Sequence, residues 1–238
     1  MSERSLVPPT LRARIRAAAV PFAVAMGRVG LTPNALTVIG FLGVCVSAVL
    51  AGMQAWIAAG AVSLAFAAFD LLDGSLARAT GRVSKFGGFL DSTLDRAGEG
   101  VMYVGITIGA LSTGQTALAA AAAAAMVPAF MVSYTRARAE GLGFSCEVGI
   151  APRAERVVIT GIGLLATGIA GGIAPPVVTG SIAMDVRYVS GPGSLDFVDV
   201  GGSIWLAAML GLLIVMTTIT VLQRIAHVRA VAGRAEEH

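Results

Sequence analysis

Six apolar stretches, each about as long as a membrane span, constrain the fold of this 238-residue chain more than any other feature. They cover residues 33–53, 55–77, 92–112, 116–135, 155–174 and 202–223. A helix of about 20 mostly apolar residues is long enough to cross the hydrocarbon core of a bilayer. The chain is 56% hydrophobic and only 13% charged, whereas soluble domains carry roughly twice that charge. The sequence therefore predicts an all-α integral membrane protein, a six-helix transmembrane bundle forming a single domain over 1–238.

The distribution of basic residues predicts how this bundle is oriented. Of 17 Lys and Arg residues, five precede the first stretch, four lie within 78–96, four within 136–156, and three follow the last stretch. Only Arg187 falls on the other side. The positive-inside rule then places both termini and both basic loops in the cytoplasm, in a multi-pass protein of the cell membrane. The sequence pI of about 9.3 reflects this belt. No nucleic-acid-binding motif accompanies it, so we expect no nucleic-acid partner.

The N-terminal segment, residues 1–30, has a different character. Arginines at 12, 14, 16 and 28 alternate with apolar side chains. This pattern is typical of an amphipathic helix that lies along the membrane surface, with its arginines near anionic lipid headgroups. We expect a juxtamembrane amphipathic helix here, with membrane lipids as its partners.

Four carboxylates stand where a membrane-spanning chain rarely carries any. Asp70 and Asp73 end the second stretch, and Asp91 and Asp95 begin the third. Members of each pair share a helix face, and the two helices are expected to be antiparallel neighbours, so the four carboxylates can converge. Oxygen-only ligands select hard cations such as Mg²⁺, Mn²⁺ or Ca²⁺. Four carboxylates suffice for a two-metal site acting on a phosphoryl group.

The residues around these aspartates favour a phosphate-containing ligand. Gly74 leaves space directly after Asp73, and Gly87 leaves space one turn before Asp91. Arg78 offers a guanidinium suited to phosphate oxygens, and Ser84 lies in the intervening loop.

Asn34 and Thr37, at the start of the first stretch, allow two interpretations. They follow Thr32-Pro33 and can simply belong to a helix start. Alternatively, they present polar groups to the site from its cytoplasmic edge.

The second basic loop also allows two interpretations. Its four arginines, Arg136, Arg138, Arg153 and Arg156, can serve only to orient the chain in the membrane. However, orientation does not explain why the loop contains arginine and no lysine. Arginine binds phosphate in a bidentate manner, which favours an anion pocket beside the metal site.

The four carboxylates also allow two alternatives to an enzyme. The acids could form a structural ion-pair network with Arg78 and Arg96, but two arginines cannot balance four clustered carboxylates. A divalent-cation transporter would also need intramembrane acids. A transporter would distribute polar groups through the membrane, whereas here they crowd at one interface.

The whole constellation resembles the signature of the CDP-alcohol phosphotransferases. The matching string is Asp70-x2-Asp73-Gly74-x2-Ala77-Arg78-x8-Gly87-x3-Asp91-x3-Asp95. The resemblance implies a homodimeric membrane enzyme that uses two divalent cations, usually Mg²⁺ or Mn²⁺. It also implies that a CDP-lipid such as CDP-diacylglycerol donates its phosphatidyl group to an alcohol and CMP is released.

Within that family, the finer resemblance is to phosphatidylinositol-phosphate synthases. It is carried by residues 91–96, 133–140 and 153–156. This resemblance implies inositol phosphate as the acceptor, Asp95 as a general base, and CDP-lipid contacts from the following residues: Asn34, Thr37, Asp70, Asp73, Gly74, Arg78, Ser84 and Gly87. Phosphatidylglycerophosphate synthases, the alternative, tend to have Pro and Lys where this chain has Ser92 and Arg96.

Overall fold

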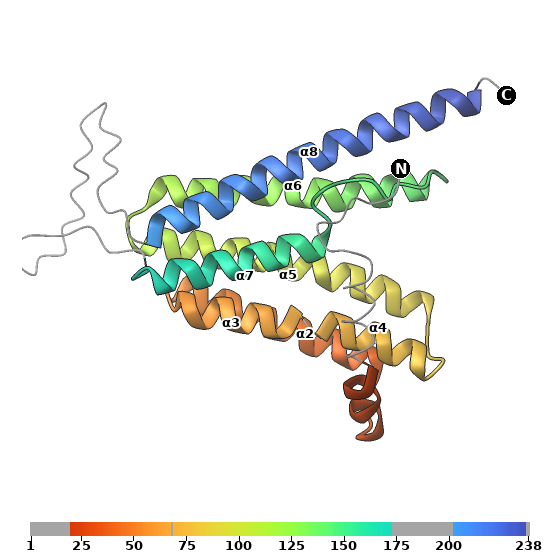
Figure 1. The fold of residues 1–238 in the computed structure, drawn as a ribbon, viewed down its shortest axis with the longest axis horizontal. Helices are drawn as coiled ribbons and strands as arrows, with labels where there is room; N and C mark the ends of the chain where they lie inside the picture. The colour runs from red at the N-terminus through yellow and green to blue at the C-terminus, as the bar shows by residue number, and fades with distance from the viewer. Residues whose placement is uncertain (1–19, 68, 173–201, 237–238) are drawn as a thin grey trace, which may run out of the picture.

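The computed structural model describes residues 20–67, 69–172 and 202–236, and its regular structure over these ranges is entirely helical (Figure 1). The main elements are α2 (Pro33–Gly52), α3 (Trp56–Ala67), α4 (Phe69–Ala79), α5 (Lys85–Ser112), α6 (Thr116–Gly141), α7 (Arg153–Ile169) and α8 (Gly202–Glu236). The prediction of an all-α fold is confirmed.

Six of these helices form a closed ring. Going around it, α2 packs on α3, α3 on α7, α7 on α8, α8 on α6, α6 on α5, and α5 again on α2. α4 continues the direction of α3 and packs on α2 and α3 (Figure 1). A buried core fills the ring, with Trp56, Met102, Ile106, Leu164 and Leu210 among its members. Helices distant in sequence, such as α3 and α7, therefore become neighbours.

Within the described part of the chain, four helical segments are long and apolar enough to cross a membrane. They are Pro33–Gly52, Trp56–Ala79, Thr116–Gly141 and Gly202–Gly233, so α3 and α4 together count as one span. The other two predicted spans correspond to α5 and α7. α7 has only 17 residues, and α5 keeps charged side chains as far along as Glu99. The multi-pass character is confirmed, and the count of six remains a prediction.

Local sequence signals explain where the helices at the site begin. Thr32 caps α2 by accepting a hydrogen bond from the Ala35 amide at 3.2 Å, with Pro33 in the first turn.

Gly105 lets α5 approach α2 closely, because a Cβ atom there would collide with the carbonyl oxygen of Ala48. This close packing sets the position of the α5 acids relative to α2.

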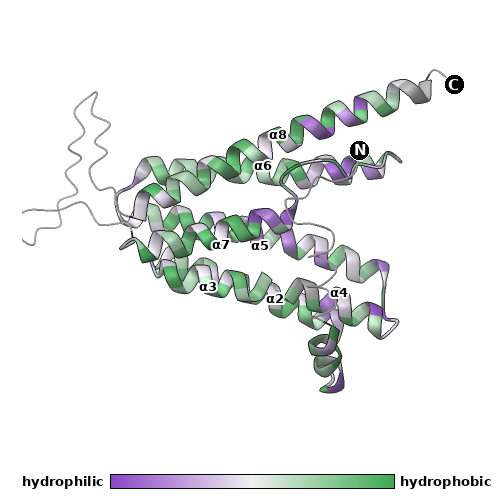
Figure 2. Ribbon diagram, in the orientation of Figure 1, coloured by the Kyte–Doolittle hydropathy of each residue, from purple (hydrophilic) through white to green (hydrophobic). Residues whose placement is uncertain are grey.

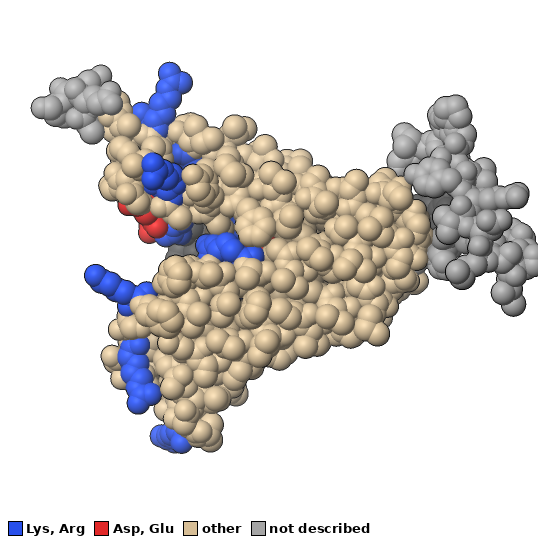
Figure 3. Space-filling model, turned by 180° about the vertical axis from the view of Figure 1, so that it is seen from behind, with Lys and Arg blue, Asp and Glu red and all other residues tan. Residues whose placement is uncertain are grey.

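One end of the bundle carries most of the visible charge. The ribbon is mainly apolar through its middle and hydrophilic at the end where α4 turns into α5 and where α8 finishes (Figure 2). From behind, Lys and Arg side chains gather around a hollow at the same end (Figure 3). This asymmetry matches the basic belt expected from the sequence.

Part of the expected amphipathic helix lies outside the described residues, because the structure describes the segment 1–30 only from residue 20 on. Residues 20–28 are helical and run across the bundle axis (Figure 1).

Candidate active site at the charged end of the bundle

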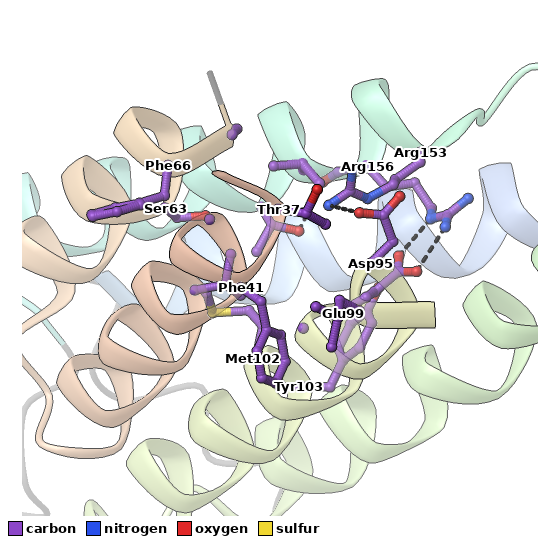
Figure 4. A pocket seen from close by; sticks show the side chains of 17 residues that line it. Thr37, Phe41, Ser63, Phe66, Asp95, Glu99, Met102, Tyr103, Arg153 and Arg156 are labelled. Atoms are coloured by element: carbon purple, nitrogen blue, oxygen red, sulfur yellow. Dashed lines mark hydrogen bonds and ion pairs between the residues drawn. The ribbon is translucent and has the colours of Figure 1, made fainter. Parts of the chain in front are cut away.

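A pocket opens inside the ring toward the charged end, between α2, α3, α5 and α7 (Figure 4). Its wall is polar on the side of α5 and α7 and largely apolar on the side of α2 and α3. Its lining includes the polar residues Thr37, Asp95, Glu99, Arg153 and Arg156.

Two ion pairs join α5 to α7 across this pocket. The Arg153 guanidinium lies 2.8 Å from Asp95 Oδ1. Arg156 binds Glu99 in a bidentate manner, with Nε 2.5 Å from Oε1 and NH2 2.7 Å from Oε2. Figure 4 shows the two acids on one helix facing the two arginines on the other. Charge-assisted hydrogen bonds are strong, and the bidentate pair is also directional, so together the two pairs hold the helices in a defined register.

Burial distinguishes the two arginines. The Arg156 side chain is 2% exposed, and its NH1 also donates to the Ala151 carbonyl at 3.0 Å. The Arg153 side chain is 26% exposed. Arg156 is therefore committed to the protein interior, whereas Arg153 faces both Asp95 and the mouth of the pocket.

Asp95 sits in a positive environment. Besides Arg153, the guanidinium of Arg96 lies 3.5 Å from its Oδ2. Asp91 is half-buried one turn earlier on the same face of α5. Of the two aspartates Asp91 and Asp95, Asp95 is the one that lines the pocket.

Asp73 approaches from α4. It is buried, its Oδ2 accepts a hydrogen bond from the Thr37 hydroxyl at 2.7 Å, and its Oδ1 accepts one from the Gly74 amide. Thr37 therefore connects the α4 acid to the pocket lining. α4 and α5 both pack on α2, so α2 connects the helix of Asp73 with the helix of Asp95.

The described side chains do not include that of Asp70. Among those that are described, no three His, Cys, Asp or Glu residues gather closely enough to hold one ion. The predicted ligands Asp73, Asp91 and Asp95 nevertheless all offer carboxylate oxygens at the same end of the bundle. This donor chemistry suits Mg²⁺ or Mn²⁺ and not a soft metal.

The residues predicted to contact a CDP-lipid fall into two groups. On α4, the Arg78 guanidinium lies over Gly74, where a Cβ atom would be 3.3 Å from NH1. At the start of α5, a Cβ atom on Gly87 would be 3.0 Å from Ser84 Oγ and 3.2 Å from Asn34 Oδ1. Both glycines therefore adjoin polar side chains of the protein, and their use by a ligand stays a prediction.

Ser84 also has a structural role. Its hydroxyl caps α5 by accepting a hydrogen bond from the Gly87 amide at 2.9 Å.

The four arginines of the second basic loop do not gather in one place. Arg153 and Arg156 line the pocket. Arg136 instead pairs with Glu140 at 2.8 Å and lies 3.8 Å from Glu147. Arg138 is exposed in the last turn of α6, outside the pocket lining.

Comparison with known proteins now decides the family. The sequence model described as CDP-alcohol phosphatidyltransferase matches residues 30–185, well over half of the chain. This chain belongs to the CDP-alcohol phosphatidyltransferase family. The enzyme class and family predicted from the aspartate motif are therefore confirmed, and membership favours an enzyme over a cation transporter.

Curated relatives narrow the comparison. The chain is 43% identical over 139 residues to the archaetidylinositol phosphate synthase of Methanothermobacter thermautotrophicus, covering 58% of this chain and 69% of the relative. It is 39% identical over 152 residues to the phosphatidylinositol phosphate synthase of Cutibacterium acnes, covering 63% and 73% respectively.

Solved structures of a family member resemble the whole bundle. The Mycobacterium tuberculosis phosphatidylinositol phosphate synthase with CDP-DAG bound superimposes with a TM-score of 0.69 at 29% identity, covering 88% of this chain and 92% of that one. The same enzyme in complex with manganese and citrate gives a TM-score of 0.68 at 29% identity, covering 88% of each chain.

Sequence reasoning did not single out Glu99. This residue stands four positions after Asp95 and thus continues the series of acids at 91 and 95 along one face of α5. Because the family motif ends at Asp95, the continuation of the spacing was the only signal available. In this phosphatidyltransferase, Glu99 is the partner that holds Arg156.

Proposed function

We propose that this enzyme transfers the phosphatidyl group of CDP-diacylglycerol, or of a related CDP-lipid, to inositol phosphate and releases CMP. The observation that carries the proposal is the contact between Asp95, the last aspartate of the family motif, and Arg153, an arginine suited to a phosphate. A carboxylate that can accept a proton and a cation that can bind the acceptor's phosphate thus lie within one pocket. The two curated relatives described above are an archaetidylinositol phosphate synthase and a phosphatidylinositol phosphate synthase, which supports the same acceptor.

The proposed chemistry is a direct displacement. The acceptor hydroxyl oxygen attacks the phosphorus of the phosphatidyl group, its proton passes to Asp95, and the P–O bond to CMP breaks with the electron pair leaving on CMP. Arg153 turns from Asp95 to the acceptor phosphate, which frees the carboxylate for the proton. Arg156 stays bound to Glu99 and holds α7 in place.

We propose Asp70, Asp73, Asp91 and Asp95 as the residues that would hold Mg²⁺ or Mn²⁺, with two ions per site. Two bound dications would polarise the pyrophosphate of the CDP-lipid and neutralise charge on the departing CMP. Thr37 orients Asp73 through its hydrogen bond. The manganese complex of the related M. tuberculosis enzyme is consistent with this choice of metal.

The CDP-lipid is proposed to lie along α4 and the start of α5. Arg78 would bind its phosphates, and the space left by Gly74 and Gly87 would admit the nucleotide. Asn34 and Ser84, which both lie beside Gly87, complete this side of the proposed site. Arg136 and Arg138 remain predicted acceptor contacts, although neither lines the pocket.

For the membrane arrangement, we propose a single-domain homodimer in the cell membrane that crosses it six times. Support comes from the six-membered helix ring, in which α5 and α7 run beside the four candidate spans. The basic residues at one end favour a cytoplasmic location for both termini and for the active site (Figure 3).

An acceptor panel tests the proposed function. Purified enzyme is supplied with CDP-diacylglycerol, Mg²⁺ or Mn²⁺, and inositol phosphate, free inositol or glycerol 3-phosphate, and CMP release is measured. We expect inositol phosphate to be used at least about tenfold better than inositol, since one charged contact is lost with the latter. A preference for free inositol would contradict a pocket that binds the acceptor's phosphate. A preference for glycerol 3-phosphate would be compatible with that pocket but would contradict inositol phosphate as the acceptor.

A further inference from the structure

The connection between α6 and α7 is fastened to α8, although none of the described residues that line the pocket belongs to α8. We call residues 144–152 of this connection the strap. Three α8 side chains on successive turns contact its backbone. Arg224 Nε donates to the Val148 carbonyl at 2.9 Å, and His227 Nε2 lies 3.1 Å from the Ser145 carbonyl. The third, Thr220, lies nearest to α7.

Thr220 is fully buried and binds the strap at two adjacent amides. Its Oγ1 accepts hydrogen bonds from the Ile150 amide at 3.2 Å and the Ala151 amide at 3.0 Å. The same hydroxyl donates to the Met216 carbonyl within α8 at 2.8 Å. The strap has no regular structure, so its backbone amides need hydrogen-bond acceptors from elsewhere. The Thr220 hydroxyl supplies one acceptor for two of these amides.

Gly149 makes this close approach possible. Its φ of +136° lies in a region that other residues rarely adopt, and a Cβ atom there would collide with the Thr220 methyl group. Glycine and threonine are therefore matched across the contact between the strap and α8.

Ala151 links Thr220 to the arginines of the pocket. Its amide is bound by Thr220, and its carbonyl accepts a hydrogen bond from Arg156 NH1 at 3.0 Å. Two residues later, α7 begins at Arg153. A shift of the buried residue Ala151 would therefore change the positions of both Arg153 and Arg156.

We propose that Thr220 is a positioning residue of the transfer reaction, which acts through the strap to hold Arg153 and Arg156 against Asp95 and Glu99. The inference rests on the proposed function, in which Arg153 binds the phosphate of the acceptor. Thr220 touches neither arginine, so it acts on the acceptor side of the reaction only through the backbone.

The test compares Thr220→Val with Thr220→Ser. Valine keeps the shape but removes the oxygen, whereas serine keeps the oxygen. With the acceptor that wild type uses best, we expect Thr220→Val to raise the acceptor KM about fivefold to tenfold, the effect of one or two neutral hydrogen bonds. The KM for CDP-diacylglycerol should stay within about twofold. Hydrogen–deuterium exchange of strap peptides should be faster in this variant, and Thr220→Ser should match wild type in all three measurements.

Thr217→Val is the matched control. Thr217 lies about one turn earlier on α8, is also fully buried, and donates its hydroxyl to the Leu213 carbonyl of its own helix. We expect neither strap exchange nor acceptor KM to change in this control. Gly149→Ala provides a second perturbation from the strap side and should act in the same direction as Thr220→Val.

Three results would overturn the role of Thr220: unchanged strap exchange in Thr220→Val, faster exchange with an unchanged acceptor KM, or an equal effect in Thr217→Val. The proposed function fails separately, if the wild-type enzyme prefers an acceptor without phosphate. In that case, the exchange and KM measurements with the preferred acceptor still decide the role of Thr220.

Discussion

Arg153 of α7 holds Asp95 of α5 in a 2.8 Å ion pair inside the pocket. The carboxylate that ends the family motif is thereby joined to an arginine 58 positions later in the chain. In the proposed reaction, this pairing would put the group that accepts the proton of the acceptor beside the group that binds its phosphate.

Replacing Arg153 by alanine should weaken acceptor binding. Loss of one charged hydrogen-bonded contact costs about 1.5–3 kcal/mol, so the acceptor KM should rise about ten- to a hundredfold. The KM for CDP-diacylglycerol should change little, because the proposed CDP-lipid contacts lie on α2, on α4 and around the start of α5, whereas Arg153 belongs to α7. Steady-state kinetics of CMP release measure both constants. Arg229→Ala, at an exposed position of α8 outside the pocket lining, is the control, and an equal effect there would contradict the assignment.

Asp95→Asn should separate binding from chemistry. Asparagine keeps the size of the side chain but cannot accept the hydroxyl proton as a carboxylate does. We expect CDP-diacylglycerol binding to persist, measured by equilibrium binding in detergent, while CMP release falls by at least about a hundredfold. If binding is lost to the same extent as turnover, Asp95 acts as a ligand and not as a base.

Asp73→Asn tests the proposed metal site. The amide oxygen can still accept the Thr37 hydrogen bond, so the variant should fold, but it lacks the charge that a dication requires. CMP release should be abolished, as in Asp70→Asn and Asp91→Asn. EDTA should stop the wild-type enzyme, and Mg²⁺ or Mn²⁺ should restore it. Substantial turnover in any of the three variants would argue against two bound ions.

Breaking the pair between Arg156 and Glu99 should destabilise the bundle. Arg156 is buried, and removing one partner of a buried ion pair costs about 3–5 kcal/mol because the other charge is left uncompensated. Glu99→Gln should therefore lower the thermal unfolding midpoint in detergent. Arg136→Ala breaks an exposed pair worth at most about 1 kcal/mol and should leave the midpoint nearly unchanged. Equal midpoints for the two variants would refute a structural role for Glu99.

Much of this enzyme was predictable because the signals are local. Apolar stretches of about 20 residues indicate membrane helices, and the spacing of Asp91 and Asp95 puts both on one face of α5. The motif from Asp70 to Asp95 also identified the family, which the match over residues 30–185 confirms. None of these conclusions requires knowing which helices are neighbours.

The tertiary structure decided which distant residues meet. Four arginines with equal claims in the sequence divide into Arg153 and Arg156 in the pocket, Arg136 paired with Glu140, and Arg138 exposed. The location and partners of each arginine depend on the order of helices around the ring, which no local spacing encodes. Contacts across that ring, such as those of Glu99 with Arg156 and of Thr220 with Ala151, form only when α7 comes to lie between α3 and α8. Sequence alone determined the class of chemistry and the helix that carries it, whereas long-range packing selected the side chains that complete the pocket.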